Sequence, residues 1–207
     1  NKCGAKIKYT SDSTIAVKGV EKLNGCEYRI MPDRIAAATY FAAAAVTGGE
    51  ISVRDIHYPD IDSFITVFEQ MGCHVYTYSD RIYLNAFHPL KAVKTIKTMP
   101  FPGFPTDAQA VIMAALCKAK GTSIFEENIF ENRYRHVDEL LRMGADIKVV
   151  GKAAIIDGVE KLYGAKVTST DLRGGAALVV AALGAEGETE VSEVRHIDRG
   201  YDSIETV

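Results

Sequence analysis

One pattern, an aspartate followed by an alanine-rich apolar run and then a glycine, occurs three times in this chain. The copies are Asp33 with Arg34 to Val46, Asp107 with Ala108 to Lys120, and Asp171 with Leu172 to Leu183. A carboxylate accepts hydrogen bonds from the free N–H groups at a helix start, and glycine commonly ends a helix. Each copy therefore predicts a helix. A period of roughly 70 residues is too long for a solenoid and fits a two-helix α/β unit built three times.

Short β-like runs and further acidic helix starts complete each copy. The β-like runs are Ile51 to Ile56, Thr122 to Phe125 and Thr189 to Val194, and the second helix starts are Asp62, Asp138 and Asp202. Polar turns predict three hairpins, which join Lys6–Tyr9 to Thr14–Val17, Val75–Tyr78 to Arg81–Leu84, and Ile147–Val150 to Ala154–Ile156. The chain is therefore expected to be an α/β protein with antiparallel strands.

The three alanine-rich helices are apolar on every side, unlike ordinary amphipathic helices. Helices of this kind are usually buried, and small side chains let helices approach one another closely. We therefore expect these helices to pack together in the interior, with the sheets outside them. Gly174 and Gly175 are interpreted as close-packing positions, because no phosphate-binding glycine pattern surrounds them.

Composition excludes several classes of function. The net charge of −3 argues against nonspecific nucleic-acid binding, and no apolar run reaches the roughly 20 residues that span a bilayer. The four cysteines and five histidines show no metal-ligand spacing, so no metal and no cofactor are expected. Scattered free thiols fit a reducing compartment, and Cys117 is interpreted as a core residue. A cytoplasmic protein is expected.

The ends of the chain stop inside repeated elements. Cys3-Gly4-Ala5-Lys6-Ile7 resembles Met143-Gly144-Ala145-Asp146-Ile147, where a glycine follows a helix and precedes a strand. Ser203 to Val207 matches Ser63 to Val67, where a helix has just begun. We therefore expect the chain to be a piece of a longer protein.

The stretch Phe101 to Ala110 joins a rigid turn to an acidic helix start. Its two prolines and its glycine restrict the approach to the helix, and Asp107 follows at once. The simplest interpretation of Asp107 is a helix cap, and the same interpretation covers Asp33 and Asp171.

Four motifs carry a resemblance to a known family. They are Phe104-Pro105-Thr106-Asp107-Ala108-Gln109, Ile129-Phe130-Glu131-Asn132-Arg133, Thr170-Asp171-Leu172-Arg173 and His196-Ile197-Asp198-Arg199-Gly200-Tyr201. In these motifs, and over essentially its whole length, the chain resembles the bacterial UDP-N-acetylglucosamine enolpyruvyl (1-carboxyvinyl) transferases. The resemblance implies two similar domains, each an inside-out α/β barrel of three pseudo-symmetric repeats, with the active site in the cleft between them. Residues 1–17 would be the end of the partner domain, and residues 18–207 the main domain, truncated in its last repeat.

The resemblance also implies a reaction and its residues. The family transfers the enolpyruvyl group of phosphoenolpyruvate to the 3-hydroxyl of UDP-N-acetylglucosamine, in the first committed step of peptidoglycan synthesis. Asp107 would be the base that meets the 3-hydroxyl, Ile129 would contact the sugar nucleotide, and Asp171 would lie by the reacting centre. Arg133, Arg173 and Arg199 would bind the carboxylate and phosphate of phosphoenolpyruvate, since a guanidinium group pairs bidentately with such anions.

Alternatives remain open. Arginines near turns are usually solvated, and all three aspartates could be caps only. The acid of the family, a cysteine on a mobile loop, belongs to the other domain, and neither Cys26 nor any other cysteine here has that setting. The chain is therefore interpreted as one inactive lobe of an enzyme that needs the missing lobe as its partner. A non-catalytic binding or structural domain of the same fold, or the enolpyruvyl transferase of shikimate metabolism, are the alternatives.

Overall fold

The computed structural model describes residues 1–11 and 13–204, which form two compact units, Asn1–Pro32 and Asp33–Val207. The smaller unit contains a hairpin of β1 (Lys6–Ser11) and β2 (Thr14–Lys18), antiparallel with Tyr9 opposite Ile15. This hairpin was predicted. The expected domain boundary after residue 17 falls near the end of β2, whereas the structure groups residues 19–32, which contain no helix or strand, with the hairpin.

The larger unit contains all the helices of the described residues. They are α1 (Arg34–Thr47), a 3₁₀ turn (Tyr58–Asp60), α2 (Asp62–Gln70), α3 (Thr106–Leu116), α4 (Val137–Arg142), α5 (Leu172–Leu183) and α6 (Arg195–Asp198). None of these helices, in the part of the chain that the structure describes, is long and apolar enough to cross a membrane.

The strands of the larger unit form four sheets. The first has the order β3 (Glu50–Arg54), β5 (Arg81–Asn85), β4 (His74–Thr77) and is antiparallel. The second has the order β6 (Ile96–Lys97), β7 (Thr122–Glu126), β9 (Ala153–Asp157), β8 (Asp146–Val150). Two short parallel pairs are β10 (Leu162–Tyr163) with β12 (Ala185–Glu186), and β11 (Lys166–Thr168) with β13 (Glu190–Ser192). The hairpins β4–β5 and β8–β9 lie where the sequence predicted them.

Two parallel strand pairs of the larger unit are connected by the same kind of crossover helix. Strands β6 and β7 are parallel and are joined through α3, and β11 and β13 are parallel and are joined through α5. Parallel neighbours need such a crossover, because a tight turn cannot return the chain in the same direction. The second and third copies of the sequence pattern therefore fold as related βαβ units.

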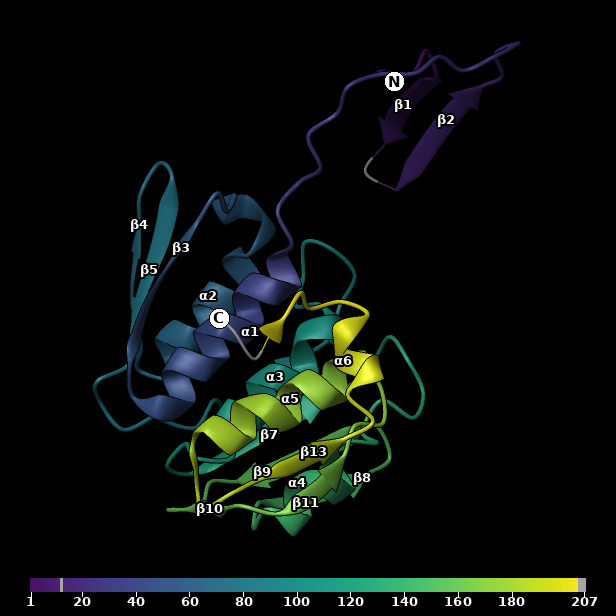
Figure 1. Ribbon diagram of the computed structural model, residues 1–207. Coiled ribbons are helices and arrows are strands. Elements are labelled where there is room, and N and C mark those ends of the chain that lie inside the picture. Colours follow the sequence, from purple (N-terminus) through teal and green to yellow (C-terminus); the bar gives the residue numbers. More distant parts are fainter. Residues whose placement is uncertain (12, 205–207) are drawn as a thin grey trace. The chain divides into compact units, whose positions relative to one another are not determined.

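Helices α1, α3 and α5 pack against one another, as the sequence predicted (Figure 1). Every residue of α3 from Ala108 to Leu116 is buried, as are most residues of α1 and α5. The first sheet lies on the side of α1, and β7, β9 and β13 lie on the side of α5 (Figure 1). A Cβ atom at Gly175 would come within 2.2 Å of Ser169 Oγ, which confirms a close-packing role for that glycine.

The helix starts differ from one another. Asp33 caps α1 by accepting hydrogen bonds from the N–H groups of Ile35 (2.8 Å) and Ala36 (3.1 Å). Asp171 caps α5 in the same way, through Arg173 N (3.0 Å) and Gly174 N (2.9 Å). Helix α3 instead begins at Thr106 after Pro105, and no side chain caps it. Asp107 is therefore the second residue of the helix, and the cap interpretation is wrong for Asp107 alone.

Two helix boundaries also differ from the prediction. Helix α3 ends at Leu116 rather than near Lys120, because Lys120 forms a β-bridge with Lys91 and its N–H donates to Leu90 O (2.8 Å). The four-residue helix α6 was not predicted, since it is too short to show periodicity; its Ile197 is buried. The second helix start of the last copy, Asp202, leads into residues outside the described part of the chain.

The C-terminal ends of the three central helices meet at one lysine. Lys118 follows α3, and its Nζ donates to Val46 O in α1 (3.4 Å) and to Gly184 O, just after α5 (3.1 Å). Carbonyl groups at helix C-termini carry partial negative charge, so the ammonium group stabilises this convergence. Helices α1, α3 and α5 therefore all end at the same end of the bundle.

Candidate active site

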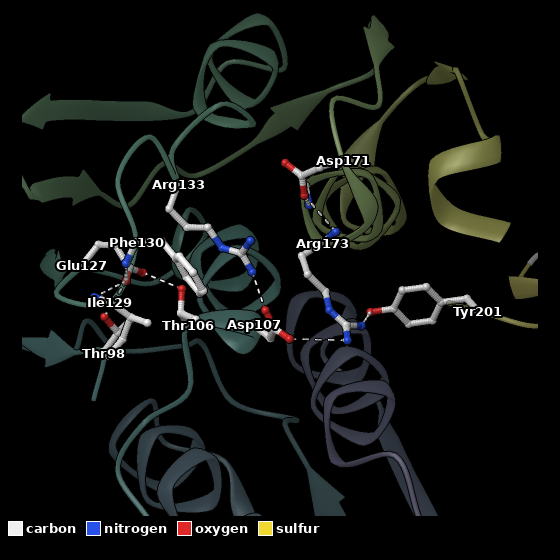
Figure 2. Close-up of polar contacts among 11 residues, drawn as sticks. Thr98, Thr106, Asp107, Glu127, Ile129, Phe130, Arg133, Asp171, Arg173 and Tyr201 are labelled. Atoms are coloured by element: carbon white, nitrogen blue, oxygen red, sulfur yellow. Dashed lines mark hydrogen bonds and ion pairs between the residues drawn. The ribbon is translucent and has the colours of Figure 1, made fainter. Parts of the chain in front are cut away.

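Asp107 lies between two arginines that come from different elements (Figure 2). Its Oδ1 accepts a hydrogen bond from Arg133 Nη2 at 2.5 Å, and its Oδ2 lies 3.8 Å from Arg173 Nη2. Arg133 belongs to the loop between β7 and α4, whereas Arg173 is in the first turn of α5. The sequence predicted all three residues as site residues, and the structure brings them together.

The exposure of these groups makes the cluster accessible. The Asp107 side chain is 45% exposed, and those of Arg133 and Arg173 are 25% and 14% exposed. The carboxylate thus reaches the surface while the guanidinium groups are partly desolvated. Two cationic forks beside one accessible carboxylate can bind a small anion and hold a hydroxyl group close to the carboxylate.

Arg173 is held by a chain of hydroxyl groups that crosses to α1. Its Nη1 donates to Tyr201 Oη (3.1 Å), which lies 2.7 Å from Thr39 Oγ1. Thr39 donates its own proton to Ile35 O in the preceding turn of α1 (2.9 Å), so the Tyr201 hydroxyl is the donor to Thr39. Each hydroxyl group therefore has one acceptor for its proton. The hydrogen bonds run in one direction, from Arg173 through Tyr201 and Thr39 to Ile35 O.

Arg133 is positioned by an aromatic ring and by its loop. Its guanidinium carbon lies 5.7 Å from the centre of the Phe130 ring, within cation–π range. Asn132 has a φ of 53°, which turns the chain sharply just before Arg133. Ile129 is 38% exposed in this loop, and its backbone N–H is already bound to Glu127 Oε1, so its contact with a ligand stays a prediction.

A cavity of about 710 Å³ adjoins the same loop. It is lined by the loop residues from 127 to 135, by Val149 of β8, and by Gly151 and Lys152 of the β8–β9 turn. Arg133, Arg135 and Lys152 bring positive charge to its walls. Arg133 is the member of the Asp107 cluster that lines this cavity, so the cavity and the Asp107 cluster share one arginine.

Two predicted site residues are placed differently. Oδ1 of Asp171 accepts the two cap hydrogen bonds of α5, so the cap interpretation is confirmed for this residue, and its role at a reacting centre stays a prediction. Arg199 is the C-cap of α6, is exposed, and among the described residues forms no side-chain hydrogen bond or ion pair. The structure does not bring Arg199 into the Asp107 cluster.

His136 is a buried histidine next to the cluster. It is 1% exposed, packs against the first turn of α5 at Gly174, and its Nε2 has no partner among the described residues. Burial lowers the pKa of His136 to about 4; Asp171 opposes this shift and Arg133 adds to it. The imidazole is therefore neutral near neutral pH and adds no positive charge to the arginines.

Sequence reasoning missed the residues that hold the cluster in place. Thr39 is a polar residue within an otherwise apolar helix, which is a signal for a buried hydrogen bond. Glu127 follows Ser123 and Phe125 at a spacing of two, and all three are buried, so strand alternation alone places Glu127 on the inner face. Tyr201 was recognised within a motif but was given no role.

No group of three or more His, Cys, Asp or Glu residues in residues 1–11 and 13–204 is arranged to hold a metal ion. The thiol of Cys117 is fully buried, and burial raises its pKa to about 12, which confirms its interpretation as a core residue.

Comparison with known protein families gave one match over residues 1–207, to the family EPSP synthase (3-phosphoshikimate 1-carboxyvinyltransferase). The chain is 47% identical over 203 residues to UDP-N-acetylglucosamine 1-carboxyvinyltransferase of Nitratidesulfovibrio vulgaris (strain Hildenborough), with 98% of this chain and 49% of that protein covered. It is 50% identical over 205 residues to UDP-N-acetylglucosamine 1-carboxyvinyltransferase 2 of Caldanaerobacter subterraneus subsp. tengcongensis, with 99% and 49% covered. The chain thus spans about half the length of the curated relatives it matches.

Solved structures show the same fold. The enolpyruvyl transferase NikO from Streptomyces tendae matches with a TM-score of 0.82 and 26% identity, over 97% of this chain and 48% of that one. EPSP synthase from Acinetobacter baumannii matches with a TM-score of 0.72 and 20% identity, over 97% and 50%. The enolpyruvyl transferase fold that the sequence predicted is confirmed at this level.

Replacing Tyr201 with phenylalanine tests the hydroxyl chain. Tyr201→Phe should lower the free energy of unfolding by about 1 kcal/mol, because Arg173 and Thr39 each lose a partner. In a double-mutant cycle measured by urea unfolding, Tyr201→Phe and Thr39→Val should be non-additive by about 0.5 kcal/mol or more. Additive losses would show that the two hydroxyl groups do not act together.

A second prediction concerns pH. The pKa of His136 is lowered in the folded chain, so as pH falls the unfolded chain binds this proton first, and stability is lost between about pH 6.5 and pH 4. His136→Leu should therefore reduce the loss of unfolding free energy between about pH 7 and about pH 4.5 by roughly 2–3 kcal/mol. Parallel profiles for His136→Leu and the unmodified chain would contradict the assignment.

Proposed function

The chain belongs to the EPSP synthase (3-phosphoshikimate 1-carboxyvinyltransferase) family, and we propose that it forms one lobe of a UDP-N-acetylglucosamine 1-carboxyvinyltransferase. The relatives that carry this name are 47% and 50% identical to the chain, whereas the likeness to the Acinetobacter EPSP synthase, at 20% identity, concerns the fold alone. This difference favours the sugar nucleotide over 3-phosphoshikimate as the acceptor. The product would enter peptidoglycan synthesis in the cytoplasm.

The observation that carries the proposal is that the Asp107 side chain does not cap its helix and faces two arginines instead. Of the three aspartates that start the repeated helices, Asp33 and Asp171 use their side chains as caps. Asp107 does not cap its helix, is 45% exposed, and faces Arg133 and Arg173. A carboxylate that does not cap its helix, at the start of that helix and between two anion-binding groups, is suited to act on a substrate hydroxyl.

The proposed reaction is an addition followed by an elimination. Asp107 takes the proton of the sugar 3-hydroxyl while the oxygen of that hydroxyl adds to C2 of phosphoenolpyruvate. At the same time, C3 of phosphoenolpyruvate takes up a proton from an acid. Inorganic phosphate then leaves C2, and C3 gives up a proton, which restores the double bond. The family resemblance assigns the acid to a cysteine of the other lobe.

The arginines would bind the anionic groups of phosphoenolpyruvate. In the free chain the guanidinium groups of Arg133 and Arg173 face Asp107, and the substrate carboxylate or phosphate would replace it. Arg199, exposed on α6, would complete the anion site when the lobes close, and Ile129 would contact the sugar nucleotide. Asp171 would act by orienting Arg173 through the first turn of α5.

We also propose the two-lobed arrangement of the family. The relatives are about twice as long as this chain, which leaves room for a second domain of similar size. In this proposal α1, α3 and α5 are the inner helices of an inside-out α/β barrel of three repeats, and residues 1–17 belong to the partner lobe. Each substrate would be bound from both sides, in a cleft that excludes water.

Release of inorganic phosphate tests this function against a non-catalytic binding domain of the same fold. The two-lobed protein that contains this chain should release phosphate from phosphoenolpyruvate when UDP-N-acetylglucosamine is added, and not when shikimate 3-phosphate is added instead. The chain as given should release none alone, because the acid is on the other lobe. Phosphate release that depends on shikimate 3-phosphate would support the alternative acceptor, and none with either would support a binding domain.

Asp107→Asn tests the base, with Asp33→Asn as the matched control. Both residues are aspartates at the start of a repeated helix, and asparagine caps a helix about as well as aspartate. In the two-lobed protein, Asp107→Asn should lower kcat by about 10²-fold or more through loss of a general base. Asp33→Asn should leave kcat within about twofold, because its cap is preserved. Equal effects on kcat in a steady-state phosphate assay would show that Asp107 is not the base.

A further inference from the structure

Glu127, the residue after β7, carries a buried carboxylate, is 2% exposed, and accepts hydrogen bonds at both carboxylate oxygens. Its Oε1 accepts from Thr98 Oγ1 (2.9 Å), Ile129 N (2.9 Å) and Phe130 N (3.1 Å), and its Oε2 accepts from Thr106 Oγ1 (2.8 Å). A buried charge is costly unless donors surround it, so four donors to one side chain indicate a specific task.

The four donors belong to three separate segments. Thr98 lies just after β6, Thr106 is the first residue of α3, and Ile129 and Phe130 are in the loop that leads to Arg133 (Figure 2). Thr98 Oγ1 also accepts from Asn128 N at 2.8 Å. The N–H groups of three consecutive loop residues are thereby bound to Glu127 or to its partner Thr98.

Both members of the Asp107–Arg133 pair adjoin this network. Thr106 precedes Asp107 directly in α3, so the hydrogen bond to Oε2 holds the backbone next to Asp107. Phe130 supplies the ring that faces the Arg133 guanidinium group, and its N–H is bound to Oε1. One carboxylate therefore connects the segment that carries Asp107 to the segment that carries Arg133.

We propose that Glu127 is a positioning residue that holds the loop 128–133 against the start of α3, so that Asp107 and Arg133 face each other before any substrate binds. The consequence for turnover rests on the proposed function, whereas the geometric part does not. Within residues 1–11 and 13–204, the Glu127 side chain forms no hydrogen bond or ion pair with either guanidinium group, and it acts through Thr106, Ile129 and Phe130.

Glu127→Gln and Glu127→Ala differ in how many of the hydrogen bonds to residue 127 they can keep. In Glu127→Gln the amide oxygen can still accept from Thr98 and the loop N–H groups, and the amide NH₂ can donate to Thr106 Oγ1 once that hydroxyl rotates. In Glu127→Ala all four donors lose their acceptor inside the protein. Glutamine should therefore rescue the geometry, and alanine should not.

Glu139→Ala is the matched control. The Glu139 side chain is 12% exposed, and its Oε2 accepts from the backbone N–H of a distant segment, Thr168 N, at 3.0 Å. Removing the Glu139 side chain should reduce stability without disturbing the Asp107 cluster, since its hydrogen bond to Thr168 and its ion pair with Arg142 lie outside that cluster.

The first measurement needs no enzyme activity. The coupling between Asp107 and Arg133 is obtained from a double-mutant cycle of Asp107→Asn and Arg133→Met, by urea unfolding of the intact protein. The cycle is repeated with Glu127→Ala, Glu127→Gln and Glu139→Ala. We expect the coupling to fall by at least about half with Glu127→Ala and to persist with the other two. Unchanged coupling with Glu127→Ala would overturn the proposal, whatever reaction the protein catalyses.

The second measurement is kinetic. In the two-lobed protein Glu127→Ala should lower kcat/KM for phosphoenolpyruvate by about 10²-fold, Glu127→Gln by less than about tenfold, and Glu139→Ala hardly at all. An equal loss with Glu139→Ala would overturn the proposal, because general loosening would explain it. If the unmodified protein shows no turnover while the coupling still depends on Glu127, the positioning role stands and the proposed function fails. Should Glu127→Ala not fold, Thr98→Val replaces it in both measurements, with the same criteria.

Discussion

The close packing of α1, α3 and α5 is the constraint on which the rest of this structure depends. Alanine and glycine on the facing sides allow the helices to approach, and Gly175 leaves no space for even one methyl group beside Ser169. Lys118 joins the C-terminal ends of all three helices. At the other end, Asp107 of α3 faces Arg173 of α5, which reaches Thr39 in the second turn of α1 through Tyr201. The packing thus brings the N-terminal turns together, where the helix dipoles favour negative charge.

The candidate site arises where the repeat departs from its own symmetry. Three aspartates occupy corresponding places in the sequence, and two of them satisfy N–H groups at the start of their helices. Helix α3 begins earlier relative to its aspartate, after Pro105, so Asp107 lies inside the first turn and its carboxylate is available for other partners. A shift of the helix start by a residue or two therefore converts a structural carboxylate into one that can act on a ligand.

Elements that depend on neighbouring residues could be predicted from the sequence, whereas contacts between residues far apart in the chain could not. Long apolar runs between an aspartate and a glycine determined α1 and α5, and polar turns determined the hairpins, because these signals are local. Lys120 joined a β-bridge instead of continuing α3, since a distant segment offered its backbone a partner. Asp107, Arg133 and Arg173 were found through motifs. The sequence marked Glu127 by strand alternation, Thr39 as a polar residue in an apolar helix, and Tyr201 within a motif, but their roles depend on partners such as Thr106 and Arg173 that lie elsewhere in the chain.

Asp107 occupies both guanidinium groups of its cluster in the free chain, so an anionic ligand of these arginines would have to displace it. In the free chain the Asp107 carboxylate partly neutralises two guanidinium groups, one of them 14% exposed, and so limits the cost of holding those charges away from water. An anionic group that took over the two guanidinium groups would leave the Asp107 carboxylate free to contact another group. Phosphoenolpyruvate carries two such anionic groups. In the proposed function, binding of the donor substrate would release Asp107 for the acceptor hydroxyl.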